Sequence, residues 1–140
     1  MTESTVVPED RIVTSDEAHR LLQNAIKLKG GDYVYKNEFA SCSNFKNETD
    51  VPQCIVGHVL HSLGLGYNDC GDGTILGTIG RLRDNRPEIK FTRSAVLLLQ
   101  IAQTAQDTGA SWGSAVASAE AGLRVAAGME GIHDFWTTRG

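Results

Sequence analysis

Apolar residues recur at helical spacing in several stretches of this chain, and glycine-rich or polar turns divide the stretches. The first predicted helix begins at Thr14, whose hydroxyl suits a capping position ahead of acidic residues, and it stops at Gly30-Gly31. The longest stretch with apolar residues at regular helical spacing ends just before Gly109, a residue suited to a helix end. In all, the predicted helices cover 14–29, 52–64, 74–84, 92–107 and 112 to about 127.

The last two predicted helices lie only a few residues apart, so we expect them to pack as an antiparallel hairpin with closely spaced, alanine-rich faces. Residues 32–35 and 88–91 carry the aromatic and β-branched side chains typical of short strands. Residues 36–50 are polar and turn-rich, which predicts a long loop. The predicted fold class is mainly α, α+β at most, with four to five helices and a small two-stranded β-ribbon.

The predicted organisation is one compact domain, because no internal repeat or linker divides the 140 residues. Residues 1–13 are interpreted as a flexible acidic lead-in, 14–130 as the globular domain and 131–140 as a C-terminal tail. Trp112 is expected in the core, whereas Trp136 either folds back on the core or forms an exposed apolar tip.

Composition and charge narrow the function classes. A net charge of −4 gives no overall basic surface for nonspecific nucleic-acid binding, so no nucleic-acid partner is expected. The N-terminal segment lacks the basic and apolar regions of a signal peptide, and no apolar run approaches the ~18 residues of a membrane span. Three cysteines without an export signal do not suggest a disulfide framework, and the predicted location is the cytoplasm.

The stretch PQCIVGHVLHSLG, residues 52–64, places one thiol and two imidazoles on one side of a helix. At about 100° per residue, Cys54, His58 and His61 fall within roughly 60° of one another. The opposite half of the helix is aliphatic and is expected to face the core. Cys54 is expected in or near the first helical turn, where free N–H groups lower the pKa of a thiol.

Three interpretations of this Cys/His face stay open. In the first, zinc binds one Cys/His or His/His pair, with Cys42 or Cys70 completing the site, since Cys54 and His61 are about 10.5 Å apart along the axis. In the second, Cys54 is a nucleophile assisted by His58. In the third, which we prefer, the face is structural: the cysteine is half-buried, and the histidines are hydrogen-bonded to the covering loop.

Two further clusters of residues have the side chains of a ligand site. Residues 68–79 resemble a calcium loop, but Cys70 replaces an oxygen ligand and Ile79 replaces the closing glutamate, so calcium is rejected. The cluster of basic residues over 81–93 could hold a phosphate or an acidic surface, although a solvated loop is the preferred interpretation. They are Arg81, Arg83, Arg86, Lys90 and Arg93.

Three segments together carry a resemblance: GGDYVYK, CIVGHVLHSLGL and FTRSAVLLLQIAQTAQDTGASWGSAV. With them, the stretch from about Ala18 to Ala119 resembles a group of small proteins, with no assigned activity, that are encoded by actinobacteria and by the bacteriophages that infect them. The resemblance implies a setting, in which small phage proteins bind a host protein or block a defence system. It transfers no catalytic or binding residue to this chain.

The leading hypothesis is therefore a non-enzymatic protein-binding module that acts on a host protein, with Cys54, His58, His61, Arg81, Arg83 and Arg86 as candidate binding residues. The first alternative is a zinc- or thiol-dependent activity centred on Cys54, His58 and His61. The second is a protein that sequesters a small nucleotide at its basic loop. Apart from the possible zinc, no cofactor is expected.

Overall fold

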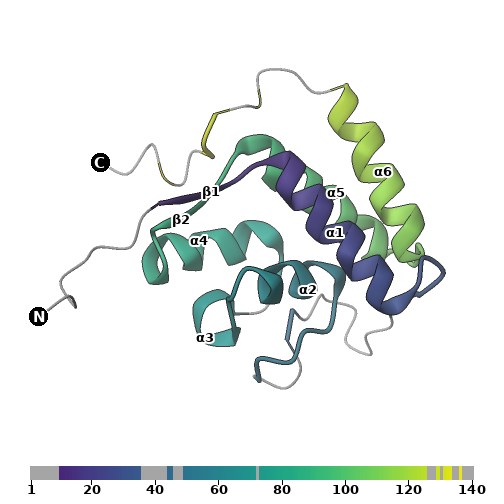
Figure 1. Ribbon diagram of the computed structural model, residues 1–140, viewed down its shortest axis with the longest axis horizontal. Coiled ribbons are helices and arrows are strands. Elements are labelled where there is room, and N and C mark those ends of the chain that lie inside the picture. The colour runs from purple at the N-terminus through teal and green to yellow at the C-terminus, as the bar shows by residue number, and fades with distance from the viewer. Residues whose placement is uncertain are drawn as a thin grey trace, which may run out of the picture.

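The computed structural model describes residues 10–35, 44–45, 49–71, 73–125, 129, 131–133 and 136. Its described residues form six helices and two short strands, which confirms the mainly α fold class (Figure 1). Their order along the chain is β1 (Arg11–Val13), α1 (Ser15–Lys29), α2 (Ile55–Ser62), α3 (Tyr67–Cys70), α4 (Ile75–Asn85), β2 (Ile89–Phe91), α5 (Arg93–Asp107) and α6 (Trp112–Arg124). The four-residue helix α3 lies where the sequence predicted only a turn.

The two-stranded sheet is parallel and joins β1 to β2. The strand predicted over 32–35 was wrong, and residues 11–13, which were assigned to the acidic lead-in, provide the first strand instead. Val13 is fully buried and pairs in register with Phe91. A parallel pair needs a long crossover, and here the crossover contains α1 to α4.

The aromatic residues of 32–35 pack against another element instead of pairing in a sheet. The backbone oxygen of Tyr33 accepts a hydrogen bond from the Trp112 amide (2.9 Å), and the Gly31 oxygen accepts one from Gly113 (2.9 Å). The Tyr33 ring meets the Trp112 ring edge to face, with centroids 4.7 Å apart. This segment therefore anchors the start of α6, and tertiary packing overrides its strand propensity.

The helix α5 is the centre of the fold, since it contacts α1, α2, α4 and α6. Its hairpin with α6 is confirmed: Gly122 of α6 lies against Ile101 of α5, and Trp112 at the start of α6 bonds to Gln106 near the end of α5. Figure 1 shows the two helices side by side. Trp112 is fully buried, as predicted.

Two buried glutamines of α5 hold the first turns of two other helices. Gln106 Oε1 accepts the amide of Ile55, at the start of α2, at 2.8 Å. One turn earlier, Gln103 Oε1 accepts the amide of Ile75, at the start of α4, also at 2.8 Å. Each bond satisfies a helix N-terminal N–H that has no partner within its own helix. The positions of α2 and α4 are thus fixed from α5.

The C-terminal segment folds back toward the sheet. The amide of His133 donates to the Phe91 oxygen (2.8 Å), and Ile132 forms an isolated antiparallel bridge with Thr92. The ring of Trp136 stacks on Phe91 with centroids 6.0 Å apart. Of the two alternatives for Trp136, packing on the core is the one observed.

Candidate functional site

Cys54 does not belong to an exposed face of α2. The helix begins at Ile55, so Cys54 is its N-cap residue, and its side chain is fully buried. The sulfur accepts a hydrogen bond from the Gly57 amide and donates one to Asn44 Oδ1, both at 3.4 Å. The expected position of Cys54 next to the first turn agrees with its role as N-cap, whereas the half-buried thiol of the preferred interpretation is corrected, because Cys54 is fully buried.

His58 is half-buried against the end of α1 and the start of α6. Its ring meets Trp112 edge to face at a centroid distance of 5.4 Å. Its Nε2 atom is buried and has no hydrogen-bond partner among the described residues, so the predicted bond to a covering loop is not seen there. Burial lowers the pKa of His58, and the charges of Lys29 and His61 add to the effect.

We expect stability to fall as the pH is lowered below about 6.5, because of His58. The native pKa lies below the unfolded value of about 6.5, so the unfolded chain binds the proton first. The stability that neutral His58 contributes is present above about pH 6.5 and is lost as the pH falls through the native pKa. One proton limits the slope to about 1.4 kcal/mol per pH unit, and partial exposure keeps it lower.

Urea unfolding at a series of pH values would measure this slope in the wild type and in His58→Phe, which keeps an aromatic ring and removes the titration. The slope should decrease in His58→Phe and persist in His61→Phe, the matched change at an exposed position of the same helix. An equal slope in all three proteins would contradict the assignment to His58.

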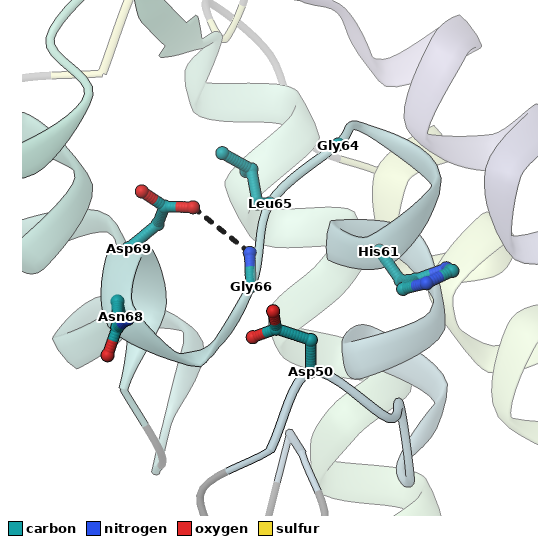
Figure 2. Close-up of a pocket in the computed structure, with 7 residues that line it drawn as sticks. All are labelled: Asp50, His61, Gly64, Leu65, Gly66, Asn68 and Asp69. Atoms are coloured by element: carbon teal, nitrogen blue, oxygen red, sulfur yellow. Dashed lines mark hydrogen bonds between the residues drawn. The ribbon is translucent and has the colours of Figure 1, made fainter.

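His61 lines a cleft that lies between α2 and α3. The cleft has a volume of about 430 Å³. Figure 2 shows the residues that line it. Its lining is Asp50, His61, Gly64, Leu65, Gly66, Asn68 and Asp69. We call it the Asp50–Asp69 cleft, because the carboxylates of these two residues lie on either side of the Gly66 backbone.

Both carboxylates of the Asp50–Asp69 cleft are held by backbone amides. Asp50 Oδ1 accepts from the Tyr67 amide at 2.9 Å, and Asp69 Oδ2 accepts from the Gly66 amide at 3.0 Å. A Cβ at position 66 would lie 2.3 Å from Asp50 Oδ1, so the Asp50 side chain would have to move from its present place. The short helix α3 thus fixes two negative charges at one concave surface. A carboxylate has several acceptor positions, so Asp50 retains capacity for another donor. Asp69 Oδ2 also lies 3.7 Å from Arg86 Nη1, so a further donor at Asp69 would share this carboxylate with Arg86.

The candidate zinc ligands are not brought together among the described residues, where no group of three or more His, Cys, Asp or Glu side chains could hold a metal ion. Cys54 is in the core, whereas His61 is exposed. Burial, with Asp69 nearby, raises the pKa of the Cys70 thiol to about 12, so it stays protonated at neutral pH. Cys42 lies outside the described residues, and the zinc alternative remains a prediction.

The candidate basic residues have acidic or backbone neighbours. Arg86 Nε donates to Glu88 at 2.7 Å, and its Nη1 lies 3.7 Å from Asp69. The hydrogen bond with Glu88 raises the pKa of Arg86 and lowers that of Glu88. Arg83 Nε lies 3.5 Å from Asp84, and the Arg81 side chain crosses the backbone of Gly71. A phosphate at this cluster would have to compete with these carboxylates for Arg83 and Arg86.

Sequence patterns alone did not point to Asp50 or Asp69 as site residues. Asp69 stands three residues after Gly66, the spacing of a helix-capping carboxylate, and this was the available signal. Asp50 lies 17 residues before its partner Tyr67 and carries no local signal. The contact between His19 Nε2 and Glu120 Oε2, at 2.5 Å, joins α1 to α6 and was also missed, since 101 residues separate the two positions.

Searches of protein-family models, of curated proteins and of solved structures found no match to this chain. Within the described residues, no helix has both the length and the apolar character needed to cross a membrane.

Proposed function

We propose that this chain is a non-enzymatic protein-binding module that holds a basic side chain of a partner protein in the Asp50–Asp69 cleft. The observation that supports this proposal is the concave surface with two carboxylates that backbone amides keep in place. Pre-positioned acceptors reduce the ordering cost of binding. A guanidinium or ammonium group offers several donors to such a pair.

An apolar contact next to the cleft would strengthen such an interaction. Val51 follows Asp50 directly and is 54% exposed. Lysine and arginine bury their aliphatic stems on apolar surface while their charged ends reach polar groups. The net charge of −4 also favours the approach of a basic partner.

The proposed setting is the cytoplasm of an actinobacterial cell, where a phage-encoded copy would bind and modulate a host protein. The resemblance of three sequence segments supports this setting. The structure also revises the candidate residues: His61 lines the cleft, whereas Cys54 is in the core and Arg83 lies beside Asp84. The proposed binding residues are therefore Asp50, His61 and Asp69.

A matched capture experiment tests the proposal. The tagged protein would be crosslinked in an actinobacterial extract, and captured proteins would be quantified by mass spectrometry for the wild type and for Asp50→Asn/Asp69→Asn. Asparagine keeps an acceptor oxygen for the two backbone amides and removes both charges. Capture of a specific partner should fall about tenfold, since losing two attractive charges costs at least ~1.4 kcal/mol.

The control is Asp16→Asn, which removes a carboxylate from the exposed start of α1. It should capture the partner as well as the wild type does. Equal capture by the cleft variant and the control would show that the cleft is not the docking surface. A crosslinking experiment that enriches no protein with the wild type would contradict the binding function itself.

A further inference from the structure

A hollow of about 380 Å³ lies between the first turns of α1 and the last turns of α6. Figure 1 shows that α6 ends on the side of the molecule where α1 begins. The hollow shares no lining residue with the Asp50–Asp69 cleft. Its lining includes Asp16 and His19 of α1, Leu98 of α5, and Glu120, Leu123 and Arg124 of α6. We call it the α1–α6 hollow.

Residues three and four positions apart share one face of a helix, so the α1 and α6 residues of the lining form two facing walls. His19 Nε2 lies 2.5 Å from Glu120 Oε2 and thereby joins the two walls. Gln23 Nε2 lies 3.3 Å from the same ring atom and also holds the imidazole. The hollow is therefore built into the fold, and a preformed site reduces the ordering cost of binding.

The apolar part of the lining continues the hydrophobic core. Leu98 is only 1% exposed, and Leu123 is partly buried and packs against the core cluster. A ligand in the hollow would thus meet aliphatic surface between the two helices. Small-molecule sites combine such surface with a few polar groups that fix the orientation of the ligand.

One charge of each sign at the α1–α6 hollow is not used by the fold. Asp16 stands in the first turn of α1 and Arg124 in the last turn of α6, and both are exposed. Neither side chain has an ion-pair partner among the described residues. Glu120, by contrast, is engaged by His19. The hollow therefore offers a separate carboxylate on one wall and a separate guanidinium on the other.

We propose that the α1–α6 hollow binds a small zwitterion with an apolar side group, of the chemical class of a free aliphatic α-amino acid. The ammonium group of the ligand pairs with Asp16, its carboxylate pairs with Arg124, and its side chain lies on Leu98 and Leu123. A volume of about 380 Å³ is at the lower end of the range of small-molecule sites, which suits a ligand of this size. Because both charged side chains are exposed, we expect a dissociation constant of about 1 mM.

Titration with L-leucine, followed by ¹H–¹⁵N NMR, tests this proposal. Amide signals of the lining residues should shift and reach saturation with a dissociation constant of about 1 mM. Isovalerate lacks the ammonium group and isoamylamine lacks the carboxylate, so each should bind about fivefold more weakly. Glycine keeps both charges without an apolar side group, and it should also bind about fivefold more weakly.

Two substitutions assign the charges to their partners. Arg124→Gln and Asp16→Asn should each weaken L-leucine binding about fivefold. Arg124→Gln should leave the binding of isoamylamine unchanged, and Asp16→Asn should leave that of isovalerate unchanged. Both positions are exposed, so the fold should be retained. The matched control is Lys27→Gln, at an exposed position near the other end of α1, which should bind L-leucine as the wild type does.

Shifts that are absent from the lining residues at 20 mM L-leucine would overturn the proposal. Equal binding of L-leucine and isovalerate would do the same, because it would show that the ammonium group has no partner. Asp50→Asn/Asp69→Asn should bind L-leucine like the wild type. A loss of binding in that variant would place the ligand in the Asp50–Asp69 cleft and contradict the α1–α6 site, without affecting the capture experiment proposed for the cleft.

Discussion

Replacing Gln106 with methionine is expected to lower the free energy of unfolding by about 3 kcal/mol. The Gln106 side chain is almost fully buried, and its Oε1 atom accepts two hydrogen bonds, from the Ile55 amide at 2.8 Å and from Trp112 Nε1 at 3.1 Å. Methionine has a similar shape but offers no comparable acceptor. Two buried donors would lose their partner, and each unsatisfied group costs about 1–3 kcal/mol.

Chemical denaturation would measure this loss against two matched variants. Gln103→Met removes the acceptor of the Ile75 amide and the donor to the Gly73 oxygen, but no buried tryptophan N–H, so it should also destabilise the protein, by less than Gln106→Met does. Gln100→Met, on the outward face of the same helix, should change the stability of the monomer by less than about 0.5 kcal/mol. Equal effects at positions 100 and 106 would show that Gln106 does not hold α2 and α6.

The three α5 glutamines also show what sequence periodicity can and cannot supply. The helix itself was predicted over 92–107 and found over Arg93–Asp107, because its apolar spacing and its ending are local signals. Gln103 and Gln106 are polar residues at inward positions, and their partners lie 28 and 51 residues away in the chain. A local pattern carries no information about such pairs, so the way in which α2 and α4 are anchored could not be predicted.

The candidate site was predicted in part. The aliphatic half of α2 follows from helical periodicity, and the structure agrees with it. The preferred interpretation placed a covering loop over His61, whereas the structure leaves His61 exposed. Cys54 was expected in or near the first turn and caps it, but its side chain is fully buried where a half-buried thiol was preferred. Cysteine is not among the usual capping residues. Threonine is one of them, and Thr74 occupies the equivalent position before α4. The carboxylates of the cleft depend on contacts between separate segments.

The beginnings of α2 and α4 repeat one local arrangement. A capping residue, Cys54 or Thr74, is followed by isoleucine, an aliphatic residue and glycine. In both helices the glycine amide donates to the side chain of the cap, at 3.4 Å in α2 and 3.3 Å in α4. What differs is the surroundings of the glycine, and this difference provides a matched pair of substitutions.

Gly57→Ala is expected to lower the free energy of unfolding by about 4 kcal/mol, whereas Gly77→Ala should raise it by about 0.5–1 kcal/mol. A Cβ at position 57 would lie 2.0 Å from the backbone oxygen of Asn44, so α2 or the Asn44 segment would have to move. That movement would break the buried bonds of Asn44 to Thr78 (3.0 Å) and to Cys54. At position 77 the nearest atom is Thr74 Oγ1, at 3.6 Å.

Since both glycines occupy the third position of their helices, the intrinsic gain from alanine, up to about 1 kcal/mol, is the same in both. The difference between the two variants therefore measures the close approach of Asn44 to α2, and denaturant unfolding of both proteins gives it directly. A Gly57→Ala protein as stable as Gly77→Ala would mean that the Asn44 backbone does not pack on α2. The loss of stability we expect would instead establish that this glycine is required to bring the segment before the Asp50–Asp69 cleft against the helix that carries His61.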